Sequence, residues 1–112
     1  ADGALAGQHN ERLEFIGDRV LGLAVADMLY RRYPHEPEGA LAKRLTALVQ
    51  QSALVKVAQA HNLGDHLRLS PAERKAGMRD AMLADALEAL IGAIFLDGGY
   101  LAAASVVAAH WT

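Results

Sequence analysis

Three carboxylates, Glu11, Glu14 and Asp18, share one side of the apolar segment NERLEFIGDRVLGL, residues 10–23. On a helical wheel of about 100° per residue they fall in a narrow sector beside the apolar side chains, and Gly22 in the same sector leaves room above them. Acids on a solvated helix usually have basic partners four residues away, whereas Glu14 is followed at that distance by Asp18. This spacing is compatible with a functional carboxylate site as well as with an acidic surface.

A second segment, LADALEALIGAIFLDGG at residues 83–99, repeats the design. Asp85 and Glu88, three residues apart, form an acidic edge beside a continuous apolar arc, and Gly92 rather than a cation lies four residues after Glu88. Both segments are apolar enough to be central helices. We therefore expect their acidic edges to face each other.

Clustered carboxylates near a core require a compensating cation. The sequence contains no cysteine, and no histidine belongs to the cluster, so the ligands would all be oxygen atoms, which suits Mg²⁺ or Mn²⁺. A carboxylate-held Mg²⁺ activates water and stabilises a leaving oxygen, so the expected chemistry is hydrolysis at phosphorus. Two alternatives stay open on spacing alone: a solvated acidic face on either helix, and a helical nucleotide pyrophosphohydrolase.

Helices must position these acids, and the patterns predict helices throughout. Asn10 is a favourable N-cap for the first helix, and Pro34 disfavours its continuation. Asp97-Gly98-Gly99 ends the second acidic helix. The expected helices span residues 10–33, 38–51, 52–61 and 81–96, and a last one starts near residue 100. No stretch alternates with a period of two for long enough to form a strand, so the expected fold class is all-α.

The chain has 112 residues, enough for one domain, and 53% of them are hydrophobic. A formal net charge of −2 argues mildly against unaided binding to a polyanion, and the absence of cysteine excludes disulfides. The apolar run at residues 81–96 is interrupted by Asp85 and Glu88, so no membrane-spanning segment is predicted, and a cytoplasmic location is expected. Because the chain lacks an initiator methionine, we expect a fragment of a longer protein.

The amino-acid sequences of the two acidic blocks are more informative than the spacing of their acids. NERLEFIGDRVLGL closely resembles the signature of the ribonuclease III endonuclease domain, LADALEALIGAIFLDGG resembles the second block of that family, and EPEGALAKRL resembles a third, weaker one. The resemblance implies that residues 1–112 form an all-α ribonuclease III catalytic domain without its N-terminal helix and its C-terminal double-stranded-RNA-binding domain. It further implies a homodimeric, Mg²⁺-dependent endonuclease that cuts double-stranded RNA, leaving 5′-phosphates, 3′-hydroxyls and short 3′ overhangs.

The same resemblance implies roles for individual residues. Phe15 matches an aromatic side chain that inserts into the partner subunit, whereas Arg19 departs from the Ser or Ala that many members carry. The acids divide into metal ligands, catalytic groups and auxiliary acids: Glu14, Asp85 and Glu88 as ligands, Asp18 and Glu88 as catalytic groups, and Glu11 and Glu38 as auxiliary acids. A catalytically silent dimerisation module is a further alternative, against which the complete acid set argues.

Basic residues supply candidate contacts to RNA phosphates, which dominate duplex affinity. Arg74, Lys75 and Arg79, with Arg68 before them, concentrate positive charge in a short polar region and are the predicted RNA-binding residues. Lys43 and Arg44 on the exposed side of their helix are equally well explained as solvated residues. The histidines show no ligand spacing and are interpreted as residues of helix entries, of the surface or of chain ends.

Overall fold

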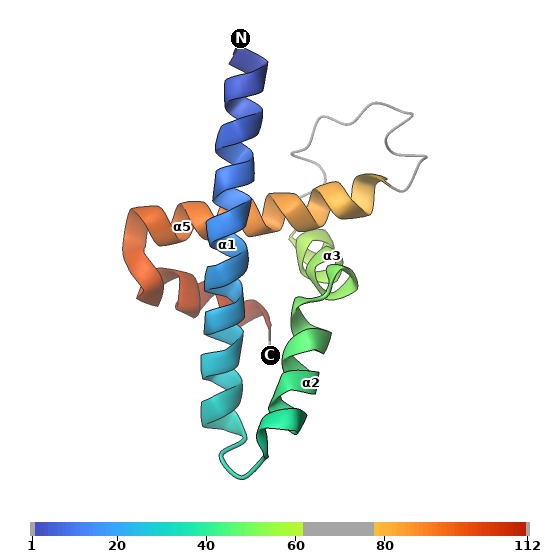
Figure 1. Cartoon of the computed structure of the whole chain (residues 1–112), viewed down its shortest axis with the longest axis vertical. Coiled ribbons are helices and arrows are strands. Elements are labelled where there is room, and N and C mark those ends of the chain that lie inside the picture. Colours follow the sequence, from blue (N-terminus) through green and yellow to red (C-terminus); the bar gives the residue numbers. More distant parts are fainter. Residues whose placement is uncertain (1, 62–77, 112) are drawn as a thin grey trace.

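The computed structural model describes residues 2–61 and 78–111, which form helices and contain no strand. The helices are α1 (Asp2–Arg32), α2 (Glu38–Val49), α3 (Gln51–Ala60) and α5 (Met78–His110). Figure 1 shows α1 lying across the first part of α5, while α2 runs back beside α1 and α3 lies near the start of α5. The prediction of an all-α fold is confirmed.

Helix α1 begins earlier than the sequence predicted. It starts at Asp2, so Asn10 lies inside the helix and is not its N-cap, and His9 is not a helix-entry residue. Gly3 and Gly7 favoured a loop before Asn10, but residues 4–6, Ala-Leu-Ala, are strong helix formers. Extending an existing helix also costs far less than nucleating a new one.

The other helix ends lie close to their predicted positions. α1 ends at Arg32, shortly before Pro34, as expected. α2 and α3 meet at Gln50, where φ is −68° and ψ is 159°, one residue before the predicted boundary. α5 begins at Met78, earlier than the predicted helix at residues 81–96.

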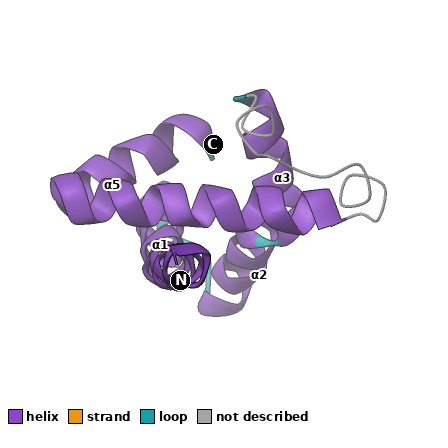
Figure 2. Ribbon diagram, turned by 90° about the horizontal axis from the view of Figure 1, so that it is seen from above, coloured by secondary structure: helices purple, strands orange, loops and turns teal. Residues whose placement is uncertain are grey.

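Helix α5 is broken at Gly99, whose φ of 84° and ψ of −179° are not helical. Glycine adopts positive φ without steric cost, which explains why the chain changes direction here. The predicted end at Gly99 and new start near Tyr100 correspond to this break, although the ψ value is extended rather than left-handed helical. Figures 1 and 2 show the segment after Gly99 folding back beside the first part of α5.

By length and composition alone, α5 is long and apolar enough to cross a membrane, so the expectation that Asp85 and Glu88 leave no such segment is wrong. Within this domain its apolar side has other partners. Leu87 and Ile91 are buried in the main core with residues of α1, and Leu83 is buried with Val55 and Ala58 of α3. Packing against α1 and α3 accounts for part of the apolar composition of α5, since 22% of its apolar window is buried.

Two leucines depart from the predicted core. On a helical wheel Leu23 and Leu90 belong to the apolar arcs of their helices, but their exposed fractions are 59% and 46%. The wheel treats the apolar arc as one broad face, whereas the crossing of α1 and α5 buries only the part that faces the other helix. The largest fully buried side chains are Leu21, Val25, Leu83, Ile91 and Val107.

Arg44 holds the corner between α1 and α2. Its Nε and Nη2 donate hydrogen bonds of 2.7 Å to the two carboxylate oxygens of Glu36, and its guanidinium carbon lies 3.7 Å from the centroid of the Tyr33 ring. A planar guanidinium can pair with a carboxylate and stack on an aromatic ring at the same time. Arg44, considered above as a phosphate contact, is thus engaged within the domain, whereas Lys43 is exposed.

Candidate active site

Two glycines allow α1 and α5 to cross in backbone contact. A Cβ atom on Gly17 would overlap the carbonyl oxygen of Glu88, and a Cβ atom on Gly92 would overlap the carbonyl oxygen of Leu13. Any larger residue at either position would push the helices apart. Because Gly17 immediately precedes Asp18, this close approach places the acids of α1 beside those of α5.

The predicted meeting of the two acidic edges occurs at this crossing. Glu14 and Glu88 are half-buried, whereas Asp18 and Asp85 are exposed. Burial, a hydrogen bond with Asp18 and the negative charges of Asp18, Asp85 and Glu14 raise the pKa of Glu88 from 4.5 to about 8. Burial and the charges of Asp85 and Glu11 also raise the pKa of Glu14. The carboxyl groups of both helices thus lie close enough to perturb one another.

A cavity of 530 Å³ opens beside Glu14 and Asp85. Its other lining residues are Asn10, Glu11, Met82, Ala86 and Ala89. The small alanines of α5 leave space next to the carboxylates, where a hydrated cation or a phosphate group can approach. Asn10 and Met82 were not predicted as site residues, but each lies three or four residues from a site acid, the spacing of neighbours on a helix.

The donor set fits a hard divalent cation in its chemistry. Within residues 2–61 and 78–111, no group of three or more histidine or carboxylate side chains is arranged to enclose a metal ion. Mg²⁺ does not require such a cage, since it retains several waters and is usually bound by one or two carboxylates plus substrate phosphates. Protonation of Glu88 relieves its repulsion with the surrounding acids, and a bound cation would do the same in place of the proton. The ligand assignment of Glu14, Asp85 and Glu88 stays a prediction.

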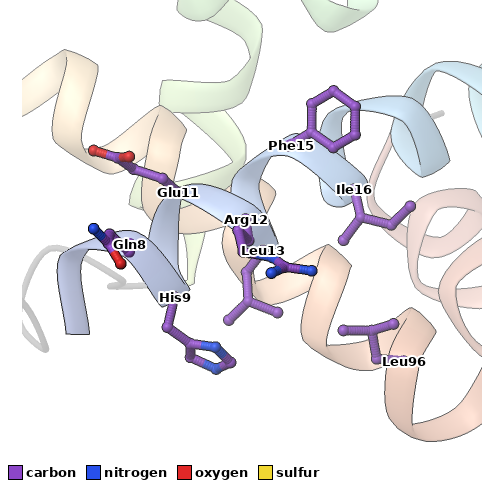
Figure 3. A pocket seen from close by; sticks show the side chains of 8 residues that line it. All are labelled: Gln8, His9, Glu11, Arg12, Leu13, Phe15, Ile16 and Leu96. Carbon is purple, nitrogen blue, oxygen red and sulfur yellow. The ribbon is translucent and has the colours of Figure 1, made fainter. Parts of the chain in front are cut away.

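Phe15 is 64% exposed and lines a second cavity, of 740 Å³, formed by α1 and Leu96 of α5. Figure 3 shows Leu13 and Ile16 pointing toward Leu96, while Phe15 points away from it. Phe15 therefore projects away from the apolar core of the subunit; its role as a dimer contact stays a prediction. The guanidinium carbon of Arg19 lies 5.7 Å from the centroid of the Phe15 ring.

Glu38 does not join the acidic cluster of this subunit. It is an exposed residue in the first turn of α2, beyond the end of α1. The helical segment from Asp18 to Arg32 alone spans about 21 Å at 1.5 Å per residue. The assignment of Glu38 as an auxiliary acid therefore stays a prediction, as does that of Glu11, which does line the cavity beside Glu14.

The predicted RNA-binding residues are only partly described. Arg79 is half-buried in the first turn of α5. Arg68, Arg74 and Lys75 lie outside the described residues, so their predicted role has no structural counterpart here.

Sequence reasoning missed the two crossing glycines. Gly22 was noted as a source of space, and an added Cβ there would indeed meet no atom within 4 Å. Gly17 and Gly92, which hold the acids together, carried a recognisable signal: an isolated glycine inside a strongly helical, apolar segment usually has a packing reason.

These features define an all-α domain with a carboxylate site of the type used for metal-dependent hydrolysis at phosphorus. A family model described as ribonuclease-III-like matches residues 2–111. The ribonuclease 3 of Vibrio cholerae is 48% identical over 103 residues, covering 90% of this chain and 46% of that protein. The ribonuclease 3 of Cupriavidus taiwanensis is 52% identical over 102 residues, covering 89% of this chain and 40% of that protein.

Solved structures agree with the sequence relatives. The nuclease domain of ribonuclease III from Campylobacter jejuni, described with a flexible region involved in dimer formation, superposes with a TM-score of 0.82 at 42% identity, covering 89% of this chain and 71% of that one. Dicer from Pichia stipitis gives a TM-score of 0.71 at 28% identity, covering 88% and 48%. The chain belongs to the ribonuclease III family, and its fold is that of the family's nuclease domain. It spans less than half the length of the two curated relatives.

Proposed function

We propose that this domain is the catalytic part of a Mg²⁺-dependent endoribonuclease that cuts double-stranded RNA in rRNA and mRNA processing. The products would carry 5′-phosphates and 3′-hydroxyls, with short 3′ overhangs. The supporting observation is the convergence of four acids from α1 and α5, where burial and the neighbouring negative charges raise the pKa of Glu88 to about 8. Such a concentration of carboxylates stabilises a cation that each helix alone would hold weakly.

The acids would have different roles in this reaction. Glu14, Asp85 and Glu88 would hold Mg²⁺, which when bound supplies an activated water and neutralises charge on the leaving oxygen. Asp18, beside Glu88 in the cluster, would order the attacking water and take up its proton. Hydrolysis forms a bond from the water oxygen to phosphorus and breaks the bond from phosphorus to O3′, so the leaving 3′-oxygen takes up a proton.

A homodimer would supply the surface that a duplex needs. Phe15 and Leu96 are 64% and 65% exposed, and both line the 740 Å³ cavity. An exposed aromatic side chain beside an apolar cavity is typical of an interaction site. In the proposed dimer, Phe15 of each subunit enters the cavity of the other. Each subunit would then cut one strand.

The test incubates the purified chain with end-labelled double-stranded RNA and Mg²⁺ at low salt. We expect discrete products on a denaturing gel that vanish in Asp18→Asn and Glu88→Gln. Asp80→Asn, which removes an exposed carboxylate of α5 outside the cluster, is the matched control and should cut like the parent chain. Cleavage that persists in Glu88→Gln would overturn the site assignment.

The same assay separates the alternatives. Release of pyrophosphate from free nucleotides, without RNA cleavage, would identify a nucleotide pyrophosphohydrolase instead. Duplex binding without cleavage by a folded, dimeric chain would indicate a silent dimerisation module. Family membership favours the nuclease, since the curated relatives are named ribonuclease 3.

A further inference from the structure

Two histidines that the sequence separates by almost half the chain meet at one point of the fold. His61 follows α3, and His110 is the last residue of α5. Nε2 of His61 and Nδ1 of His110 are 3.0 Å apart, with ring centroids at 4.2 Å and ring planes at 80°. Both histidines are surface residues, as interpreted from the sequence, but their proximity was not predicted. Both side chains are exposed, so solvent and ions can reach the pair.

The separation of the two nitrogens matches that of two ligands on one transition-metal ion. Two imidazole nitrogens that each lie about 2.0–2.1 Å from one ion are about 2.9 Å apart when the N–ion–N angle is a right angle. They are about 3.3 Å apart when that angle is tetrahedral. The observed 3.0 Å falls inside this interval. In the neutral pair, one of the two nitrogens donates its hydrogen to the other. Binding an ion requires only that this hydrogen move to the second nitrogen of the same ring, through solvent.

Backbone contacts hold the two helix ends that carry the imidazoles. The amide of His61 donates to the carbonyl oxygen of Ala58 at 3.3 Å, which fixes the end of α3. Trp111, next to His110, is buried; its amide donates to Val107 at 2.8 Å, and its indole nitrogen donates to the carbonyl oxygen of Leu48 at 3.1 Å. Since the two helix ends are anchored, little ordering is left for an ion to impose.

The surroundings favour ions that prefer nitrogen. No carboxylate is among the described residues that line the 320 Å³ cavity beside His110, and Lys56 there repels every cation, so binding would depend on the imidazole nitrogens. A hard cation such as Mg²⁺, which takes oxygen ligands, gains nothing at such a place. Imidazole suits Cu²⁺, Ni²⁺ and Zn²⁺, with Cu²⁺ the strongest binder in the series.

We propose that His61 and His110 form a transition-metal site, separate from the carboxylate cluster, which takes one Cu²⁺, Ni²⁺ or Zn²⁺ ion and clamps the end of α3 to the end of α5. Water completes the coordination. Because only the folded chain brings the two imidazoles together, the ion stabilises the fold. The site requires neither the proposed nuclease activity nor the carboxylates.

The test titrates the full chain with Cu²⁺ in a large excess of Mg²⁺, which keeps the carboxylates occupied. Electron paramagnetic resonance reports the nitrogen ligands directly through their superhyperfine splitting. We expect one tightly bound Cu²⁺ with two imidazole nitrogens in the parent chain. His61→Gln and His110→Gln should each lose one nitrogen and bind at least tenfold more weakly.

His35→Gln is the matched control, because it removes an exposed histidine from the corner between α1 and α2 and should leave the spectrum unchanged. Thermal unfolding with Ni²⁺ gives a second readout: the midpoint should rise in the parent chain and in His35→Gln, but not in the two site variants. A two-nitrogen spectrum that survives in His61→Gln or His110→Gln would overturn the proposal, as would a one-nitrogen spectrum in the parent chain.

Discussion

The carbonyl oxygen of Glu88 occupies the space that a Cβ atom on Gly17 would require. This contact joins the backbone of α5 directly to that of α1, beside Asp18. The position of the Glu88 carboxyl group therefore depends on a residue without a side chain. Charge and hydrogen bonding at the cluster follow from this packing.

Replacing Gly17 with alanine should destabilise the domain. The new methyl group forces α1 away from α5, and overpacking of this kind costs about 1–3 kcal/mol. Thermal unfolding of Gly17→Ala measures the loss. Gly22→Ala, with no atom within 4 Å of the added Cβ, is the matched control. It should be neutral or stabilising by up to about 1 kcal/mol, because alanine favours the helix. Equal stability of both variants would contradict the close crossing.

Stability of the metal-free domain should fall as pH rises, because of Glu88. Its pKa is about 8 in the folded chain against an ordinary value of 4.5, so the folded state binds more protons between these values. The stabilising contribution is complete below about 4.5 and is lost as pH rises through about 8. Glu88→Gln removes this dependence. The melting temperature of the variant minus that of the parent, measured with a chelator, should increase from pH 5 to pH 9.

The affinity for Mg²⁺ should show the opposite dependence on pH. The ion competes with the proton on Glu88, so its affinity for the parent chain should increase as pH rises toward about 8, with protons released on binding. Calorimetry in buffers of different ionisation enthalpy measures the released protons. Affinity that does not change with pH, or that is equal in Glu88→Gln, would show that Glu88 does not contact the ion.

Trp111 should anchor the end of α5 through one hydrogen bond. Its indole nitrogen donates to the carbonyl oxygen of Leu48 at 3.1 Å. Trp111→Phe removes the donor and part of the buried ring. We expect a loss of about 1–3 kcal/mol, since a hydrogen bond contributes roughly 1 kcal/mol and the smaller ring leaves space behind. Chemical denaturation measures the loss, and an unchanged midpoint would argue against the anchor.

Phe15→Ala should weaken self-association without unfolding the chain. The ring is 64% exposed, so its removal leaves no cavity in the core of a subunit. Sedimentation should show a shift from dimer toward monomer, with helical content retained. Leu101→Ala, which truncates a side chain that is 78% exposed and lies outside the 740 Å³ cavity, is the control and should associate like the parent. Dimers of unchanged strength in Phe15→Ala would remove this residue from the interface.

Periodicity predicted that the chain is helical and that two of its helices carry acidic edges. The apolar spacing identified an all-α chain, and placed Glu14 beside Asp18 and Asp85 beside Glu88 on their own helices. These are local relationships, fixed by 3.6 residues per turn. Helix starts were predicted less well than helix types, as Asn10 shows, because capping propensity competes with the extension of an existing helix.

Contacts between helices were decided only by the tertiary structure. Gly17 and Gly92 set the distance between α1 and α5, and this distance raises the pKa of Glu88. The same packing exposes Leu23 and brings His61 to His110. The sequence is sufficient to predict which side chains share a face of one helix. It does not state how two helices cross, because the crossing depends on the summed packing of side chains far apart in the chain.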